Sequence, residues 1–282
     1  MRIDLHSHSS ASDGTQPPSD VVRRARERGL DVLALTDHDT VAGHASAAGA
    51  LPAGLTLVPG MELSCRRGGR SIHLLAYLFD PREPELLAEC ARIRRAREER
   101  ARLTVERLVE LGVAVTWEQV AELAAGAPVG RPHIARAMVA AGAVAEPALA
   151  FTPEWIGAGG RAHVSRYALD PGHAVRLVRA AGGVPVLAHP KAERRGEAVP
   201  DEWIAELAAA GLFGVEADHL DHDEAARHHV RGLAGELGLA VTGSSDDHGE
   251  LTGHRLGSET TDPEVYERLV ATATGAAPIT GA

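Results

Sequence analysis

The sequence has almost no lysine, little cysteine and few aromatic residues. Cys65 and Cys90 are its two cysteines, too few for a framework of disulfide bridges, and we therefore expect a reducing, cytoplasmic setting. Lys191 is its one lysine, and aromatic residues make up 3% of the chain. No apolar run approaches the roughly 18 residues that a membrane-spanning helix needs, and the first residues lack the pattern of a signal peptide. We predict a soluble protein that does not bind membranes.

Positive charge is also scarce, because the net charge is -10. Such a chain is not suited to broad electrostatic binding of a nucleic-acid backbone, so we expect no binding to duplex DNA. A phosphorylated small substrate stays compatible with this charge, since bound divalent ions can reverse the local field. The oligomeric state is left open by the sequence.

Short apolar runs that alternate with helical patterns indicate an α/β fold. The runs predicted as strands are 2–6, 31–35, 55–59, 71–78, 184–188, 213–216 and 240–242. Helical periodicity covers 18–28, 175–181, 202–210 and 223–237. This alternation predicts a parallel sheet that closes, or nearly closes, into a barrel, and 282 residues are a usual length for one.

The segment from 81 to 161 interrupts this pattern and shows only helical periodicity. We expect a long helix over 85–111, a second over 116–124 and a third in "GRPHIARAMVAAG". Residues 81–160 hold 10 arginines and 11 acidic residues, which favours a solvated helix surface over a nucleic-acid surface. We predict a discontinuous barrel domain, 1–80 and 162–282, with a helical insertion domain over 81–161 that caps the barrel mouth. The tail after Ala271 is expected to be loosely packed.

Histidine and acidic side chains lie on or directly after nearly every predicted strand, with His73 inside the fourth. They are His6, His8 and Asp13; Asp37, His38 and Asp39; Glu62; His73; His189; Glu216, His219 and His222; and Asp246 and His248. In a parallel barrel these strand ends meet at one face, so the pattern predicts a multinuclear metal site. Imidazole and carboxylate ligands without thiolate favour Mn²⁺, Fe²⁺ or Zn²⁺.

The spacing suggests how these side chains divide among the ions. One ion would be held by His6, His8 and Asp246, a second by Glu62, His73 and His189, and a third by Asp13, His38 and His248, with Glu62 bridging the first two. Ions about 3.5–4 Å apart would share a hydroxide nucleophile, which suits hydrolysis of a phosphate ester. Asp37, Asp39 and Glu216 are expected to support the ligands or cap turns, and no role is predicted for His219.

Six segments in order resemble the motifs of the polymerase-and-histidinol-phosphatase (PHP) family: "DLHSHSSASDGT", "ALTDHDT", "GMELS", "IHLLAY", "VLAHP" and "SDDHG". The resemblance implies a distorted (β/α)₇ barrel, a trinuclear metal centre and phosphoesterase activity. The ligands it implies are His6, His8, Asp13, His38, Glu62, His73, His189, Asp246 and His248. Asp13 and "GRPHIA" are similar to the branch of nucleoside 3′,5′-bisphosphate phosphatases, some of which also shorten RNA from its 5′ end. Removal of the 3′-phosphate from such a bisphosphate is the function that this resemblance implies.

The sequence offers fewer candidates for substrate binding than for metal binding. Arg131 precedes Pro132 at a predicted helix N-terminus, and with His133 it could bind a phosphate. His222 is a candidate for holding the scissile phosphate or protonating the leaving oxygen, which adds it to a catalytic set of His6, His8, Glu62 and Asp246. Tyr167 and Lys191 are placed near the barrel mouth, with a structural role left open.

Three other functions are compatible with parts of this pattern. A histidinol phosphatase would share the metal centre but would need an acidic pocket for an amine, which the insertion does not show. An amidohydrolase also begins with H-x-H on a barrel strand, yet Lys191 does not occupy a bridging position. A non-catalytic nucleic-acid-binding module is disfavoured by the intact ligand set and the negative charge.

Overall fold

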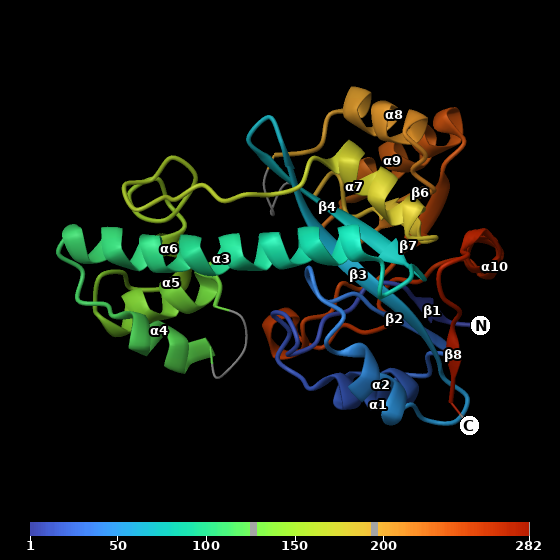
Figure 1. Cartoon of the computed structure of the whole chain (residues 1–282), viewed down its shortest axis with the longest axis horizontal. Coiled ribbons are helices and arrows are strands. Elements are labelled where there is room, and N and C mark those ends of the chain that lie inside the picture. The colour runs from blue at the N-terminus through green and yellow to red at the C-terminus, as the bar shows by residue number, and fades with distance from the viewer. Residues whose placement is uncertain (125–128, 193–196, 282) are drawn as a thin grey trace. The chain divides into compact units, whose positions relative to one another are not determined.

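The computed structural model describes residues 1–124, 129–192 and 197–281, and it divides the chain into two compact units (Figure 1). The barrel unit comprises Met1–Cys90 and Ala168–Ala282, and the insertion unit comprises Ala91–Tyr167. The expected barrel segments, 1–80 and 162–282, have borders that lie ten and six residues before these. Helix α3 (Pro84–Glu110) begins in the barrel unit and continues into the insertion unit.

Seven strands follow one another in sequence order around the barrel unit. They are β1 (Ile3–Asp4), β2 (Val32–Leu35), β3 (Thr56–Arg67), β4 (Arg70–Tyr77), β5 (Val184–Leu187), β6 (Gly214–Asp218) and β7 (Ala240–Gly243). The segments after β7 and β1 come together: Asp246 N–H donates to the His6 carbonyl and His8 N–H to the Asp247 carbonyl, both at 2.9 Å. The result is the distorted, nearly closed barrel that the sequence predicts.

The direction of β4 differs from the parallel arrangement expected. β4 pairs antiparallel with both β3 and β5. A parallel neighbour needs a crossover of a dozen or so residues, whereas β3 and β4 are joined by Gly68 and Gly69, with φ of 55° and 88°. The long β3 also carries Glu62 within the strand, not after its end.

Helices pack against the barrel through apolar faces. They are α1 (Pro18–Glu27), α2 (His44–Gly49), α7 (Pro171–Ala180), α8 (Asp201–Ala209), α9 (Glu224–Leu237) and α10 (Pro263–Thr272). Val21, Val22 and Ala25 of α1, for example, are buried in one cluster with Leu33 and Leu35 of β2. Burial of such side chains, at about 25 cal/mol per Å² of apolar surface, is the main stabilising term in this layer.

The C-terminal tail is ordered against the barrel, which corrects the expectation of loose packing. β8 (Ile279–Thr280) pairs antiparallel with the start of β3. Gly275 N–H donates to the Gly182 carbonyl at 3.0 Å. A Cβ atom at Gly275 would lie 2.4 Å from the Ala181 carbonyl oxygen, so the close approach requires glycine.

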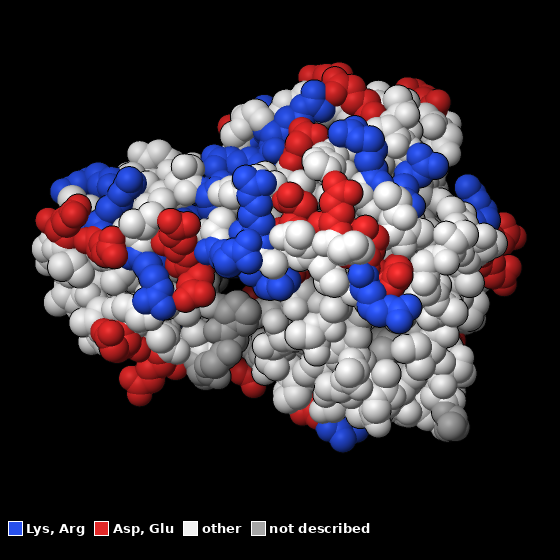
Figure 2. Space-filling model, in the orientation of Figure 1, with Lys and Arg blue, Asp and Glu red and all other residues white. Residues whose placement is uncertain are grey.

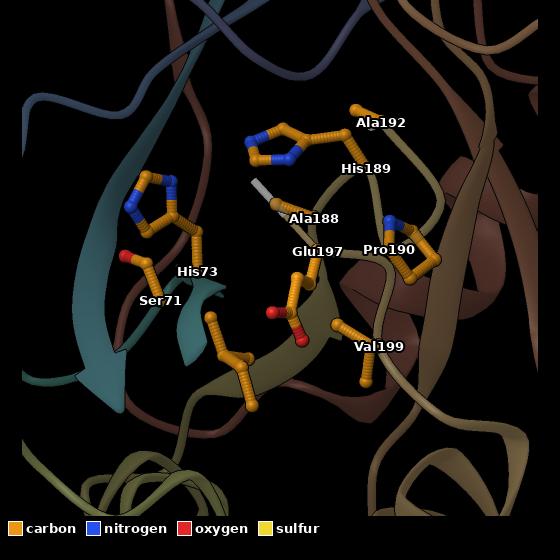
Figure 3. A pocket seen from close by; sticks show the side chains of 9 residues that line it. Ser71, His73, Ala188, His189, Pro190, Ala192, Glu197 and Val199 are labelled. Carbon is orange, nitrogen blue, oxygen red and sulfur yellow. The ribbon is translucent and has the colours of Figure 1, made fainter. Parts of the chain in front are cut away.

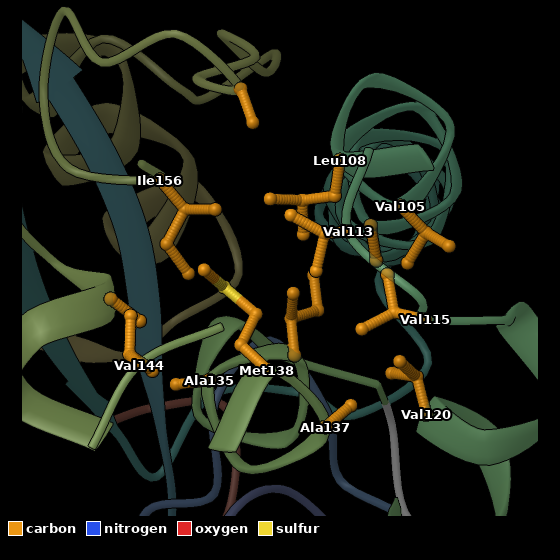
Figure 4. Packing of buried hydrophobic residues seen from close by; sticks show 14 residues of the cluster. Val105, Leu108, Val113, Val115, Val120, Ala135, Ala137, Met138, Val144 and Ile156 are labelled. Atoms are coloured by element: carbon orange, nitrogen blue, oxygen red, sulfur yellow. The ribbon is translucent and has the colours of Figure 1, made fainter. Parts of the chain in front are cut away.

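The described part of the insertion unit contains helices and no strand. Besides α3 these are α4 (Trp117–Ala124), α5 (Arg131–Ala140) and the short α6 (Pro147–Ala150). Val105, Leu108, Val120, Ile134 and Met138 meet in its buried core (Figure 4). This unit therefore has a hydrophobic core of its own.

Charged side chains of both signs are mixed along α3 in the insertion unit (Figure 2). Arg102, for example, donates to Glu98 at 3.0 Å, one turn before it. This arrangement agrees with a solvated helix surface. Within the part of the chain that is described, no helix combines the length and the apolar composition needed to cross a bilayer.

Candidate metal centre

The segments that follow β1 and β7 bring three predicted ligands side by side. His6 and His8 alternate with Ser7, so both imidazoles point to one side while the Ser7 hydroxyl donates to the Ala34 carbonyl at 2.7 Å. Asp246 is fixed beside them by its backbone hydrogen bond to His6. All three ligand candidates are buried, and Asp246 has a φ of 50°, which costs energy for a residue other than glycine.

Four side chains form the group that we call cluster A: His6, His8, Glu62 and Asp246. The Nε2 atoms of His6 and His8 are 3.1 Å apart. Each of them lies 3.1 to 3.3 Å from Glu62 Oε2 and Asp246 Oδ1. Four ligand atoms of this kind within 4.8 Å of one another fit around a single cation.

Glu62 also belongs to cluster B, which it forms with His38 and His73. His38 Nδ1 lies 3.2 Å from Glu62 Oε2, and His73 Nδ1 lies 2.8 Å from Oε1. The Nε2 atom of His189 lies 3.2 Å from the same Oε1. Glu62 thus belongs to two groups of candidate ligands, which is where a bridging carboxylate would lie.

Cluster C contains Asp13, His38 and His248, the third set expected, together with His8. Asp13 lies 3.4 Å from His248 Nε2, 3.6 Å from His38 Nε2 and 3.7 Å from His8 Nδ1. His8, His38 and Glu62 are each shared between two clusters, so the sets overlap more than the sequence suggested. The structure brings all nine predicted ligands together, eight in the clusters and His189 against Glu62.

Two buried nitrogen atoms test whether a cation fits here. The Nδ1 atoms of His38 and His73 make no hydrogen bond, although a Glu62 oxygen lies within 3.2 Å of each. The distances from these nitrogens to the Glu62 oxygens suit a hydrogen bond, but the angles do not. The Nδ1 atoms are therefore not directed at the carboxylate. Buried polar atoms are rarely left in this way unless another partner binds them. The imidazole and carboxylate donors fit divalent ions of the Mn²⁺, Fe²⁺ and Zn²⁺ type.

Burial and charge oppose each other in these clusters. Burial lowers the pKa of His8, but Asp246 and Glu62 outweigh it and raise the pKa to about 10. For His38 burial prevails and lowers the pKa to about 3. Burial raises the pKa of Glu62, yet the surrounding histidines hold it well below its usual value. Glu62 is therefore ionised at neutral pH and attracts cations.

Glu216 forms hydrogen bonds with two predicted ligands, His6 and His189, and is not itself a member of the three clusters. Its Oε1 accepts from His6 Nδ1 at 3.2 Å and from the Ser244 hydroxyl, and its Oε2 accepts from His189 N–H at 2.9 Å. A proton held on His6 Nδ1 by Glu216 would leave Nε2 as the nitrogen that can bind a cation in cluster A. Burial raises the pKa of Glu216, but His6 and other histidines outweigh this and lower it to about 2. Glu216 thus occupies the supporting position expected for it.

Asp37 and Asp39 fix the loops around His38. Asp37 accepts the N–H of Ser9 at 2.8 Å and its hydroxyl at 2.7 Å. Asp39 accepts the N–H of Ser64 at 2.7 Å and its hydroxyl at 2.8 Å. These bonds tie the loop after β2 to the loop after β1 and to β3, which agrees with the turn-capping role expected.

His219 is a site residue that the sequence analysis missed. It is fully buried, and its Nε2 lies 3.4 Å from Asp246 Oδ2. The one sequence feature that could have indicated a site role for His219 was its position at the end of β6, because the other strand ends carry candidate ligands. Glu216 and His222 lie near the same strand end, and residue spacing alone does not show which of the three side chains belongs to the site.

His222 does not have the geometry of the proton donor that we expected. Its Nδ1–H donates to the Ala217 carbonyl at 2.9 Å, and its Nε2 accepts from Lys191 N–H at 3.0 Å. Burial lowers the pKa of His222, which favours this neutral form. With both nitrogens bonded within the chain, His222 joins the loops after β5 and β6.

The Lys191 ammonium group, like the His222 ring, is bonded to other groups of the chain. Its Nζ donates to the Val199 carbonyl and to Asp201 Oδ1, the latter at 2.6 Å. The side chain is 14% exposed. Its ammonium group therefore fastens the segment that leads into α8, and a substrate would have to compete with Asp201 for it.

The remaining predicted substrate residues lie in the insertion unit. α5 begins at Arg131, as expected, and the Arg131 guanidinium lies 5.7 Å from the ring centre of Phe151. His133 Nδ1 accepts from Gly130 N–H at 3.0 Å, so this helix end presents fewer N–H groups to a phosphate than the sequence suggested. The ring centre of Tyr167 lies 3.7 Å from the Arg92 guanidinium carbon.

A cavity of about 40 Å³ adjoins cluster B (Figure 3). His73 and His189 line it together with Ser71, Ala192 and Glu197. Glu197 forms an ion pair with Arg70 at 2.7 Å. The space is enough for one or two water molecules beside the candidate ligands.

Comparison with known proteins agrees with this site. Residues 4–111 match the PHP domain family. A 5′-3′ exoribonuclease of Haemophilus influenzae is 34% identical over 88% of this chain and 90% of its own, and a 3′,5′-nucleoside bisphosphate phosphatase of Chromobacterium violaceum is 34% identical over 92% of each chain. A solved structure from Bifidobacterium adolescentis, assigned as a metal-dependent phosphoesterase, has a TM-score of 0.87 at 32% identity and covers 96% of both chains. The chain therefore belongs to the PHP family and is a metal-dependent phosphoesterase.

Proposed function

We propose that this phosphoesterase removes the 3′-phosphate from nucleoside 3′,5′-bisphosphates and also acts on short 5′-phosphorylated oligonucleotides. The proposal rests on the meeting of nine imidazole and carboxylate side chains, Glu62 among them, in a chain 34% identical to a bisphosphate phosphatase. Positive charge held there would stabilise the charge that develops on phosphoryl oxygens. The exoribonuclease relative supports the second class of substrate.

In this proposal the nine ligands hold two to three divalent ions, of which Mn²⁺, Fe²⁺ and Zn²⁺ are the candidates. When bound, such ions neutralise phosphate charge and provide a nucleophile at neutral pH. His6, His8, Glu62 and Asp246 form the catalytic set, and their burial keeps competing water away from the ligand atoms. Glu216 retains the proton on His6 Nδ1, so that Nε2 stays available as a ligand.

Arg131 and His133 are proposed to bind the second phosphate of the substrate. A guanidinium group is always charged and can donate two parallel hydrogen bonds to phosphate oxygens. His133 lies two residues further along the first turn of α5 and contributes its Nε2. A substrate with one phosphate would gain nothing from this pair.

The test is phosphate release from adenosine 3′,5′-bisphosphate by the Mn²⁺-loaded protein. Conversion to the 5′-monophosphate supports the proposal, whereas an intact bisphosphate with turnover of other phosphoesters contradicts the substrate but not the metal centre. We expect Arg131→Ala to raise KM for the bisphosphate about 10- to 100-fold, the value of one or two hydrogen bonds to a charged group. Its KM for p-nitrophenyl phosphate should stay the same. Arg136→Ala, an exposed arginine of the same helix, is the control, and equal losses on both substrates contradict the clamp.

A further inference from the structure

His219 is the first residue after β6, and its ring has a defined tautomer. Nδ1 accepts a hydrogen bond from Asp221 N–H at 3.0 Å. A neutral imidazole whose Nδ1 is an acceptor carries its proton on Nε2. That Nε2–H faces Asp246 Oδ2 at 3.4 Å, inside a region where both side chains are fully buried.

The two oxygens of Asp246 face different surroundings. Oδ1 lies 3.3 Å from His6 Nε2 and 3.2 Å from His8 Nε2, in cluster A. Oδ2 lies on the other side, towards His219, with Arg255 Nη2 at 3.7 Å. One oxygen of this carboxylate thus faces the candidate ligands, and the other faces hydrogen-bond donors.

The backbone around His219 is fixed by several further hydrogen bonds. Its carbonyl accepts from His222 N–H at 3.0 Å and from Arg227 Nη2 at 2.9 Å. Arg227 is itself anchored by Glu259 at 2.6 Å. The ring therefore approaches Asp246 from a rigid loop, which is what a precise contact requires.

We propose that His219 is a positioning residue for Asp246. Its Nε2–H holds Oδ2 and thereby turns Oδ1 towards His6 and His8, as Glu216 turns Nε2 of His6 into the same cluster. A donor on one carboxylate oxygen fixes the plane of the group and lowers the cost of ordering it when a cation binds. This inference rests on the metal centre proposed above.

Two substitutions separate positioning from a purely structural role. In His219→Asn the side-chain oxygen can replace Nδ1 and accept from Asp221 N–H, but no donor reaches Asp246. In His219→Gln the amide NH₂ can replace Nε2–H, while the bond to Asp221 is lost. If His219 positions Asp246, Gln should preserve metal binding and Asn should not. If it only stabilises the loop, the order should be reversed or the two should be equal.

The measurement is the dissociation constant for Mn²⁺, obtained by electron paramagnetic resonance on the full chain after chelation, with the Tm of the metal-free protein as a check of folding. We expect His219→Asn to weaken binding about 10- to 100-fold, the usual effect of losing a residue that orients a metal ligand. His219→Gln should bind close to wild type. Wild-type affinity in His219→Asn, or equal losses in both variants, overturns the inference while leaving the metal centre intact. Failure of the wild-type protein to bind Mn²⁺ would refute the centre, and the inference with it.

Discussion

The carboxylate of Glu62 lies within 3.2 Å of ring nitrogens from five histidines. Glu62→Gln keeps the shape of the side chain but removes its charge and one of its two acceptor oxygens. We expect kcat/KM for phosphate esters to fall by more than about 100-fold, beyond the range for residues that only orient ligands. Steady-state kinetics with Mn²⁺ tests this. Glu206→Gln, in an exposed ion pair with Arg67, is the matched control and should behave as wild type.

His44 gives a pH dependence that is separate from the clusters. Its Nε2–H donates to the Gly60 carbonyl at 2.8 Å, and burial lowers its pKa below 6.5. The unfolded chain therefore takes up this proton first as the pH falls. Stability contributed by neutral His44 is fully present above pH 6.5 and is lost as the pH falls through the folded-state pKa.

We expect His44→Gln, which keeps a donor but does not titrate, to lose less stability than wild type on acidification. Urea unfolding of both proteins at about pH 7.5 and about pH 5.5 measures the free energy of unfolding. Other titrating groups are common to the two proteins, so the difference between them isolates His44. An equal change in both would contradict the assignment.

Residue types at strand ends were sufficient to predict which side chains meet, but not how each is oriented. His6, His8 and Asp246 could be placed together because they follow neighbouring strands of one barrel. His222 could not be distinguished from a catalytic acid, since its partners are the Ala217 carbonyl and the Lys191 amide. Residue spacing does not show which backbone groups a side chain will bind. The proton-donor role expected for His222 therefore had to be revised.

At the scale of elements, the β3–β4 hairpin shows where sequence patterns are ambiguous. Buried strands of parallel and antiparallel sheets both appear as short apolar runs. The indication of a hairpin was the pair Gly68 and Gly69, which leaves no room for a crossover helix. Antiparallel pairing sets Ser64 opposite His73 and brings His73 close to Glu62. The departure from the regular barrel therefore helps to build cluster B.

A pair of glycine substitutions tests this account of the hairpin. Gly69 has a φ of 88°, and a Cβ atom there would meet nothing within 4 Å, so Gly69→Ala should act through backbone strain alone. We expect it to lower the free energy of unfolding by about 1–2 kcal/mol. Gly232→Ala, inside α9 and equally open, should raise it by about 0.5–1 kcal/mol. Urea unfolding measures both, and effects of the same sign would contradict the argument.

At the scale of the whole molecule, charge is divided between the two units. The insertion unit carries 11 arginines and 8 glutamates, a net charge of +3, which leaves -13 on the barrel unit. The nearly equal numbers of arginines and acidic residues over 81–160 did not show this division, because that range includes acidic residues of the barrel unit. The fold class followed from periodicity along the chain, whereas the charge division emerged only when contacts had defined the units.

Concentrated negative charge in the barrel unit predicts that metal binding and folding are coupled. Ions that bind the folded state alone stabilise it by about 2.7 kcal/mol at a concentration 100 times the dissociation constant. For a chain of this size that corresponds to a rise in Tm of roughly 5–10 °C. We expect chelation to lower Tm by this amount and Mn²⁺ to restore it, as measured by differential scanning calorimetry. In Glu62→Gln the restoration should be lost, because two clusters share that carboxylate, whereas Glu206→Gln should retain it. An equal rise in both variants would place the stabilising ions elsewhere in the molecule and contradict the proposed centre.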